Sequence, residues 1–480
     1  MLFNSVNFLI FLPIVFFLYW FGTKGNLKRQ NILLLVASYF FYACWDYRFL
    51  FLLIFSTVLD YSTGIKMFEA KTVKMKKFWF WLSITVNLGF LGVFKYYNFF
   101  IESAAEVLKA MGFESHFWTL QIILPVGISF YTFHGLSYVI DIYKDKIKPE
   151  RNFIDYSVFV SFFPLLVAGP IERATHLLPQ IQSKREFNYS QATDGLRQIL
   201  WGLFKKIVIA DNCAEYANMV FNSSPGELSG STHLLGVVYF TFQIYGDFSG
   251  YSDIALGTAR LFGIELLRNF AYPFFSRDTA EYWRRWHISL SSWFRDYLYI
   301  PLGGSKGGVW MKVRNTFIIF VVSGFWHGAA WTYVIWGFLN ALYIMPSIIF
   351  NTNRNNMETV AQGRTFPTLK ELYHILATFG LTVFAFIIFR AKDMSHAFSY
   401  MGELFSASLF TKPEGIKNYL VWLLILFFLI EWIGREHKYA LEKFGLNWPK
   451  PVRLAFYMVI VFAIFWFKPV HDVQFIYFQF

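Results

Sequence analysis

Ser323-Gly-Phe-Trp-His327-Gly-Ala-Ala-Trp-Thr-Tyr-Val-Ile-Trp-Gly337 is an apolar stretch that contains one histidine and no charged residue. An ionisable residue is costly inside a bilayer, so a histidine in such a stretch marks a functional site by default. Gly324 and Gly328 flank it, and residues without a side chain allow another backbone or a substrate to come close. The alternative is a histidine that only ties neighbouring helices together. The stretch predicts a membrane helix with His327 as a catalytic candidate and Trp326 as a substrate-binding candidate.

The composition of the whole chain agrees with a membrane location. Of its 480 residues, 56% are hydrophobic and 15% are charged, whereas soluble domains average about 25% charged residues. The 60 Phe and 17 Trp are typical of lipid-facing surfaces and membrane–water interfaces. No long polar linker divides the sequence. We therefore expect an all-α, polytopic protein with one integral-membrane domain over residues 1–480, in the cytoplasmic (inner) membrane.

The formal net charge of +12 has two interpretations. One is nucleic-acid binding, and the other is contact with anionic lipid headgroups. The basic residues occur in short clusters between apolar runs, which is how Lys and Arg fix the topology of a membrane protein. The charge therefore favours the lipid bilayer as a partner and excludes nucleic acid from the expected partners.

The order of apolar runs and basic clusters predicts an outward-facing N-terminus and about 11 or 12 spans, because each span needs about 20 apolar residues. Links 66–77, 144–151, 351–370 and 434–452 are rich in Lys and Arg and are expected inside. Link 221–232 has no Lys or Arg and is expected outside.

Two regions, 153–185 and 264–314, mix apolar residues with Pro, Gly or charges. They are expected to form re-entrant or interfacial helices around a central site, since irregular backbone in a membrane must be covered.

A second motif, Glu281-Tyr-Trp-Arg-Arg-Trp-His-Ile-Ser-Leu-Ser291, combines cations with aromatic rings. On a continuous helix Trp283, His287 and Ser291 would share one face. Arg284 and Arg285 have the fork geometry that binds a phosphate or carboxylate, so they are substrate-binding candidates. An amphipathic helix at the level of the lipid headgroups is an equally good interpretation of the same residues.

A third motif, Gln243-Ile-Tyr-Gly-Asp247-Phe-Ser-Gly-Tyr-Ser-Asp253, places carboxylates within a long apolar run. Gln243, Asp247 and Tyr251 recur every four residues and are expected on one helix face. Buried Asp247 and Asp253 need cationic partners, which Arg284, Arg285 or a histidine could supply. Both aspartates are candidates for substrate binding. The alternative, which the pattern favours somewhat, is a structural ion pair between helices.

Several chemistries lack their motifs in this sequence. It contains no H-E-x-x-H, no Cys/His cluster, no G-x-S-x-G and no dinucleotide fingerprint. We therefore expect no metal and no bound cofactor. A base without a protein nucleophile suits direct transfer from an activated acyl donor to a hydroxyl group.

Seven ordered motifs resemble the membrane-bound O-acyltransferase (MBOAT) family, and within it the branch of the alginate O-acetyltransferase membrane subunit. These motifs are Phe41-Tyr42…Trp45, Leu124-Pro-Val-Gly-Ile-Ser-Phe-Tyr-Thr-Phe133, Ala168-Gly-Pro-Ile-Glu-Arg173, Trp201-Gly-Leu-Phe-Lys-Lys206, Asp247-Phe-Ser-Gly-Tyr-Ser-Asp253, Trp283-Arg-Arg-Trp-His287 and Phe325-Trp-His-Gly328. The resemblance covers nearly the whole chain. It places the two catalytic histidines of the family on His327 and His287. It also implies a ring of helices around a thinned centre, with an outer funnel and a tunnel toward the cytoplasm.

The resemblance further implies a reaction. The co-substrate is an acyl thioester, acetyl-CoA or an acyl carrier, and His327 is the general base that activates the acceptor hydroxyl. The acyl group, expected to be acetyl, moves toward an extracytoplasmic polysaccharide or other cell-envelope acceptor with the help of an extracytoplasmic acyltransferase partner. Two alternatives remain at this stage. One is a transporter or flippase in which Asp247, Asp253 and His327 relay protons, and the other is a lipid O-acyltransferase of the same family.

Overall fold

The computed structural model of this protein describes residues 1–113, 119–120, 123–469 and 473–476. Every regular element in those ranges is a helix, as the sequence predicts. The chain forms two compact units. The first comprises residues 1–192 and 259–267, and the second comprises residues 193–258 and 268–480. The expected single domain over residues 1–480 stays a prediction.

Short polar residues mark the start of several helices in the first unit. Asn26, Asp46 and Thr72 accept hydrogen bonds from backbone N–H groups at the starts of α2, α3 and α4, which satisfies donors that lack a partner within the helix. The unit contains α1 (Val6–Phe17), η1 (Leu18–Gly22), α2 (Leu27–Ala43), α3 (Tyr47–Phe68), α4 (Val73–Leu91), η2 (Gly92–Tyr96), α5 (Tyr97–Ala110), α6 (Ile128–Tyr143), α7 (Phe153–Ser161), α8 (Phe163–Leu166) and α9 (Ala174–Gln182). The short α7, α8 and α9 show that region 153–185 is broken, as predicted.

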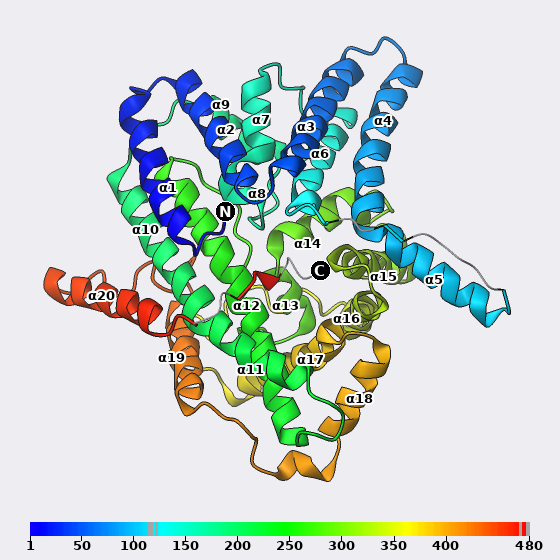
Figure 1. Ribbon diagram of the computed structural model, residues 1–480, viewed down its shortest axis with the longest axis vertical. Helices are drawn as coiled ribbons and strands as arrows, with labels where there is room; N and C mark the ends of the chain where they lie inside the picture. Colours follow the sequence, from blue (N-terminus) through cyan, green and yellow to red (C-terminus); the bar gives the residue numbers. More distant parts are fainter. Residues whose placement is uncertain (114–118, 121–122, 470–472, 477–480) are drawn as a thin grey trace. The chain divides into compact units, whose positions relative to one another are not determined.

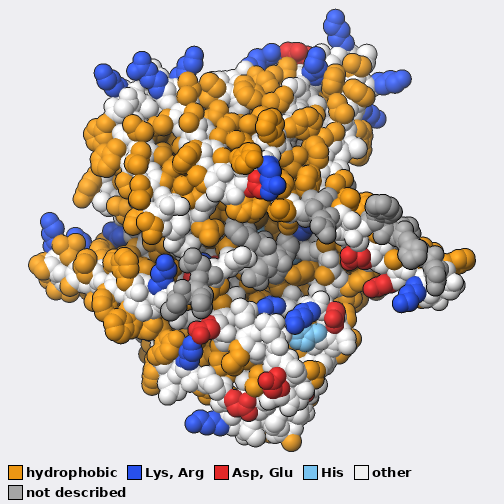
Figure 2. Space-filling view, in the orientation of Figure 1, with side chains coloured by type: hydrophobic (Ala, Val, Ile, Leu, Met, Phe, Trp, Pro, Cys, Tyr) orange, Lys and Arg blue, Asp and Glu red, His pale blue; other side chains and the backbone are white. Residues whose placement is uncertain are grey.

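Two basic links of the first unit lie together. Arg151 forms an ion pair with Glu69 at 2.8 Å, and Lys76 forms one with Asp145 at 2.8 Å. The links 66–77 and 144–151 therefore lie at the same end of the unit, which agrees with their predicted location on one side of the membrane. Figure 2 shows Lys and Arg along this end and hydrophobic side chains over much of the adjoining surface.

Four helical segments among the described residues are long and apolar enough to cross a bilayer. They are Tyr47–Phe68, Val73–Ala110, Trp331–Ile349 and Leu369–Arg390, and Val6–Gly22 and Asn418–Gly434 are shorter apolar helices. Large apolar side chains such as Phe51, which is 81% exposed, lie on the outside of these helices. A surface of this kind fits a lipid environment. The larger total of 11 or 12 spans stays a prediction.

The second unit carries the sequence motifs with candidate catalytic residues. It includes α10 except residues 189–192 and α12 except residues 259–261, which belong to the first unit. Its helices are α10 (Tyr189–Leu203), η3 (Phe204–Ala210), α11 (Asp211–Phe221), α12 (Gly230–Leu261), η4 (Pro273–Phe275), α13 (Thr279–Arg285), α14 (Ile288–Phe294), η5 (Arg295–Tyr299), α15 (Gly308–His327), α16 (Trp331–Ile349), α17 (Leu369–Arg390), α18 (Met394–Leu404), η6 (Ala407–Phe410), α19 (Asn418–Gly434) and α20 (Lys450–Trp466). Residues 264–307 form short helices and turns, and residues 308–314 begin the longer helix α15. The expected re-entrant or interfacial location of region 264–314 stays a prediction. Figure 1 shows α15 and α16 side by side.

The glycines around His327 permit the close packing of α15 on α16. A Cβ atom added to Gly324 would overlap the carbonyl oxygen of Tyr333, and one added to Gly328 would overlap the Tyr333 ring. The prediction that these two glycines allow a close approach is therefore confirmed. The approaching group is the next helix of the same chain.

Candidate active site

Helix α12 packs closely on the segment formed by α10 and η3. A Cβ atom on Gly250 would lie 2.7 Å from the carbonyl oxygen of Gly202, and one on Gly246 would lie 3.0 Å from that of Lys205. Segment η3 is a π-helix, which is a wider coil often found at functional sites. This contact brings the two lysines of η3 against the motif that contains Asp247 and Asp253.

Asp247 lies in a buried ion-pair cluster. Its Oδ1 atom is 2.8 Å from Lys206 Nζ, and the same ammonium group is 2.6 Å from Asp211 Oδ1. Asp247 Oδ2 also accepts a hydrogen bond of 2.7 Å from the backbone N–H of Ile476, near the C-terminus. One lysine thus neutralises part of the charge of two carboxylates that are each almost fully buried.

Asp253 has the other lysine as its partner. Lys205 Nζ is 2.6 Å from Asp253 Oδ2, and Gln198 donates a 2.8 Å hydrogen bond to Oδ1. The expectation that Arg284, Arg285 or a histidine pairs with Asp247 and Asp253 is therefore wrong. Lys205 and Lys206 take that role because η3 is packed against α12, a contact between segments about 45 residues apart. The predicted helix through the motif is confirmed, since Gln243, Asp247 and Tyr251 all lie in α12.

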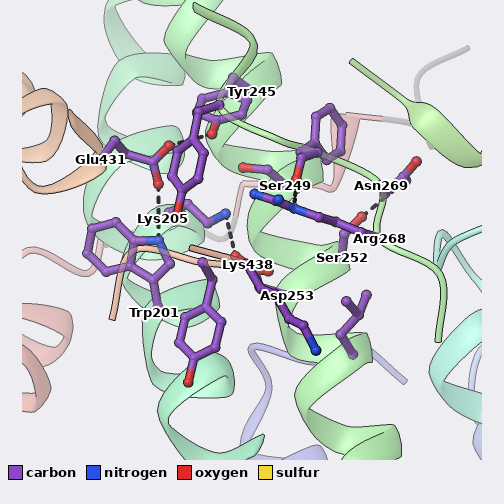
Figure 3. Close-up of a pocket in the computed structure, with 14 residues that line it drawn as sticks. Trp201, Lys205, Tyr245, Ser249, Ser252, Asp253, Arg268, Asn269, Glu431 and Lys438 are labelled. Carbon is purple, nitrogen blue, oxygen red and sulfur yellow. Dashed lines mark hydrogen bonds and ion pairs between the residues drawn. The ribbon is translucent and has the colours of Figure 1, made fainter. Parts of the chain in front are cut away.

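A pocket adjoins the Lys205–Asp253 pair (Figure 3). Its volume of about 20 Å³ holds about one water molecule. Glu431 on its wall accepts hydrogen bonds from Trp201 Nε1 at 3.2 Å and from the Tyr245 hydroxyl at 2.5 Å. Asn269 lines the same pocket and also contacts the imidazole of His287 through its side-chain oxygen.

The backbone at His287 interrupts the predicted helix. Helix α13 ends at Arg285, and His287 adopts φ 46° and ψ 52°, a left-handed conformation that is uncommon outside glycine. The prediction that Trp283, His287 and Ser291 share one face of a continuous helix is therefore wrong. The break is stabilised by Asn269, whose carbonyl oxygen accepts the backbone N–H of Ile288 at 2.9 Å. As a result, the imidazole of His287 is turned toward the Asn269 amide.

His287 is 1% exposed and has both polar and aromatic neighbours. Its Nδ1 atom is 3.0 Å from Asn269 Oδ1. The ring of Phe248, on α12, packs edge-on against the imidazole with 4.6 Å between centroids. Helix α12 therefore contributes to the position of His287 through Phe248. In the sequence of α12, Phe248 lies between the ion-paired residues Asp247 and Asp253.

His327 is the last residue of α15 and is 4% exposed. Three aromatic rings surround its imidazole: Trp326 at 5.1 Å, Trp336 at 5.3 Å and Phe389 at 5.5 Å between centroids. The ring of His287 lies 6.5 Å away, and Trp326 lies 6.0 Å from His287. The structure thus brings together three candidates from separate motifs: His287, Trp326 and His327. Water is largely excluded from a site of this kind, which strengthens electrostatic interactions within it.

Arg284 and Arg285 contact the chain itself. Arg284 donates hydrogen bonds to the carbonyl oxygens of Asn353 and Asn356, at 2.6 and 2.7 Å. Arg285 forms an ion pair with Glu281 at 2.8 Å. The Arg284 hydrogen bonds, together with one from Arg285 to the carbonyl oxygen of Glu358 at 3.1 Å, hold the link 351–358 against α13. A role of the two arginines in substrate binding stays a prediction.

Three positioning elements were not singled out from the sequence: Asn269, Phe248 and the pair Lys205–Lys206. Lys205 and Lys206 lie in one of the seven motifs that resemble the family, and this motif is the signal that could have identified them. Asn269 has no local signal, because it is a single polar residue in an irregular segment. Among the described residues, no group of three or more His, Cys, Asp or Glu side chains could hold a metal ion.

Comparisons with known proteins identify the family. A family profile described as MBOAT, membrane-bound O-acyltransferase, matches residues 145–389, which include His287 and His327. The chain is 38% identical over 411 residues to the probable alginate O-acetylase AlgI of Pseudomonas aeruginosa, covering 85% of this chain and 75% of the relative. It is 35% identical over 426 residues to the peptidoglycan O-acetyltransferase of Helicobacter pylori, covering 83% and 78%. It is 29% identical over 292 residues to the teichoic acid D-alanyltransferase of Bacillus subtilis, covering 58% and 71%. This chain therefore belongs to the membrane-bound O-acyltransferase family, and it is an O-acyltransferase.

Proposed function

We propose that this protein transfers an acetyl group from a cytoplasmic thioester toward a hydroxyl group of a cell-envelope polysaccharide. The observation that carries the proposal is the pair of buried histidines, His287 and His327, with 6.5 Å between ring centroids. The names of the Pseudomonas and Helicobacter relatives, an alginate O-acetylase and a peptidoglycan O-acetyltransferase, support acetyl as the acyl group and a glycan as the acceptor.

In the proposed reaction, His327 is the general base. It takes the proton of the acceptor hydroxyl while the hydroxyl oxygen forms a bond to the thioester carbonyl carbon. The carbon–sulfur bond then breaks, and the proton passes from His327 to the departing thiolate. Neutral imidazole suits this role, and general-base catalysis contributes about 10²- to 10⁴-fold. The aromatic rings around His327 exclude water that would otherwise hydrolyse the thioester.

The ion pairs of α12 support acyl transfer over the transporter alternative. A proton relay through Asp247 and Asp253 would require both carboxylates to face a proton donor or the cargo. Each instead forms an ion pair within 2.8 Å with a buried lysine ammonium group of the same chain. We assign the two aspartates to the support of α12.

The proposed donor is acetyl-CoA or an acetylated carrier, and the proposed location is the cytoplasmic membrane. We further propose that an extracytoplasmic acyltransferase partner completes transfer to the polymer. The outer link 221–232 is too short to fold as a domain, because stable domains need about 50 residues. A long polysaccharide needs an extended polar groove, which such a link does not provide.

Reconstitution tests this function. Purified protein in liposomes receives radiolabelled acetyl thioester on the side of the link 71–77 and polysaccharide on the other side. We expect the wild-type protein to label the polymer only when the partner is added, and His327→Ala to give no labelling. His374→Ala, a half-buried histidine outside the site, is the matched control and should retain activity. Acetyl transfer by His327→Ala would contradict the catalytic assignment, and efficient polymer labelling without a partner would contradict the division of labour.

A further inference from the structure

The pocket in Figure 3 contains two buried hydroxyl groups that have no hydrogen-bond partner among the described residues. They belong to Ser249, which is 1% exposed, and Tyr272, which is 4% exposed. The acceptors nearby are already used, because each side-chain oxygen of Asp253 and Glu431 contacts a donor of the chain. Buried polar groups are almost always hydrogen-bonded, so the two hydroxyls indicate that water or a ligand occupies the pocket.

Arg268 adds a positive charge that forms no ion pair within the described part of the chain. Its Nε atom donates a 2.5 Å hydrogen bond to the carbonyl oxygen of Phe270, and its guanidinium lies 5.2 Å from the centre of the Tyr272 ring. Figure 3 shows Arg268 and Lys205 extending into the pocket from opposite sides. Arg268 is half-buried, and a charge removed from water needs a compensating partner.

The charges of the lining favour an anion over water alone. Cationic side chains outnumber carboxylates by one among the charged residues that line the pocket, which are Lys205, Arg268, Lys438, Asp253 and Glu431. Water satisfies hydroxyl groups but leaves this charge uncompensated, whereas an oxyanion accepts hydrogen bonds from the hydroxyls and the guanidinium together. Arginine suits phosphate, because its N–H groups match the spacing of phosphate oxygens.

We propose that this pocket binds a phosphate group, with Arg268 as its main cationic ligand and the hydroxyls of Ser249 and Tyr272 as further donors. The cavity of about 20 Å³ takes about one oxygen-sized atom, so one phosphate oxygen enters it. The other oxygens stay at the mouth, beside the exposed side chain of Lys438. The proposal stands whether or not the protein transfers acetyl groups.

The surroundings of Lys438 point to the source of the phosphate. Lys438 lies just after the apolar helix α19, in the link 434–452 that is expected on the cytoplasmic side. Lysines in such a position attract anionic headgroups. The phosphate therefore belongs either to the headgroup of an anionic phospholipid in the cytoplasmic leaflet or to free inorganic phosphate.

The phosphate of a pantetheine donor does not fit this pocket. Asn269 lines the pocket and its side chain contacts His287, so one side chain separates the phosphate from the proposed reaction site. The pantetheine arm, which contains two amide groups, is much longer than this separation. The bound phosphate instead restrains the segment that contains Arg268, Asn269 and Tyr272, and thereby the contact between Asn269 and His287.

Thermal unfolding of the purified protein in detergent tests the site and identifies the source. Phosphatidylglycerol is compared with glucosyl diacylglycerol, a two-chain lipid without phosphate, and sodium phosphate is compared with sodium chloride at equal ionic strength. We expect a phosphate source to raise the unfolding temperature by about 2–4 °C at saturating concentration. A rise with phosphatidylglycerol alone identifies the headgroup, and a rise with inorganic phosphate identifies the free anion. No rise with either source rejects the proposal, and the pocket then holds water only.

Tyr272→Phe separates ligand binding from folding. The substitution removes a hydroxyl that has no partner among the described residues, so the unfolding temperature without ligand should equal that of the wild-type protein. The ligand concentration that gives half of the full rise should increase about tenfold, because one hydrogen bond to a charged group is lost. Ser249→Ala should behave in the same way, and Arg268→Met should abolish the rise.

Tyr245→Phe is the matched control at the same pocket. Its hydroxyl already donates to Glu431 at 2.5 Å, so this variant should unfold at a lower temperature and keep the wild-type affinity for the ligand. Wild-type affinity in Tyr272→Phe, Ser249→Ala and Arg268→Met would show that phosphate acts elsewhere and would overturn the assignment. If Arg268→Met gives no folded protein, the two hydroxyl variants decide the question.

Discussion

Lys206 Nζ lies 2.8 Å from Asp247 Oδ1, and both side chains are at most 5% exposed. The adjacent Lys205 pairs in the same way with Asp253 at 2.6 Å. Two consecutive lysines on a π-helix thus meet two carboxylates on α12. Phe248 lies between these two aspartates in the sequence of α12, and its ring packs on His287. The ion pairs therefore support the helix that contacts a catalytic candidate.

Replacing Lys206 with methionine should destabilise the protein strongly. The change leaves Asp211 and Asp247 buried without their shared cation, and removal of one partner from a buried pair costs about 3–5 kcal/mol. Thermal unfolding in detergent measures the effect. Lys306→Met removes an exposed lysine from a turn and should leave the unfolding temperature unchanged. Equal unfolding temperatures for the two variants would contradict a supporting role for Lys206.

A single methyl group at Gly250 should loosen α12. The added Cβ of Gly250→Ala lies 2.7 Å from the Gly202 carbonyl oxygen, and overpacking of this kind costs about 1–3 kcal/mol. Gly89→Ala is the control, because nothing lies within 4 Å of its added Cβ and alanine favours a helix. The yield of folded protein and its unfolding temperature compare the two. Unchanged stability of Gly250→Ala would show that the two backbones separate at little cost.

Arg284→Ala should release the link 351–358. The substitution removes the hydrogen bonds to the carbonyl oxygens of Asn353 and Asn356. Limited proteolysis should then cleave this link about ten times faster, because local opening costs less once these bonds are lost. Arg295→Ala, at an exposed arginine paired with its neighbour Asp296, should leave the cleavage rate unchanged. If Arg284→Ala raises the KM of the thioester and leaves proteolysis unchanged, Arg284 binds substrate as the sequence motif predicts.

The membrane topology can be tested with single cysteines. Because of their basic residues, positions 71–77 and 434–452 are expected inside, and 221–232 is expected outside. An impermeant thiol reagent applied to intact cells should therefore label a cysteine introduced at Ser224 and fail to label one at Lys74. Both are exposed positions. Labelling at Lys74 in intact cells would reverse the topology of the first unit.

The sequence by itself determined the features that depend on composition and local periodicity. The low fraction of charged residues required an apolar environment for the chain. This conclusion does not depend on how the helices pack against one another. The four-residue spacing of Gln243, Asp247 and Tyr251 determined that they lie on one helix. The apolar stretch around His327 marked that histidine, because an ionisable group there is costly.

The tertiary structure alone decided which residues act together. Lys206 and Asp247 are 41 positions apart, and their pairing depends on the close contact of η3 with α12 at Gly202 and Gly250. The sequence also showed no sign of the break at His287, because the residues on both sides of it keep the spacing of a continuous helix. That break exists because Asn269, which is 18 positions away, bonds to both the backbone and the imidazole. Spacing along a chain reports which face a residue occupies, whereas the partner on that face is set by the packing of distant segments.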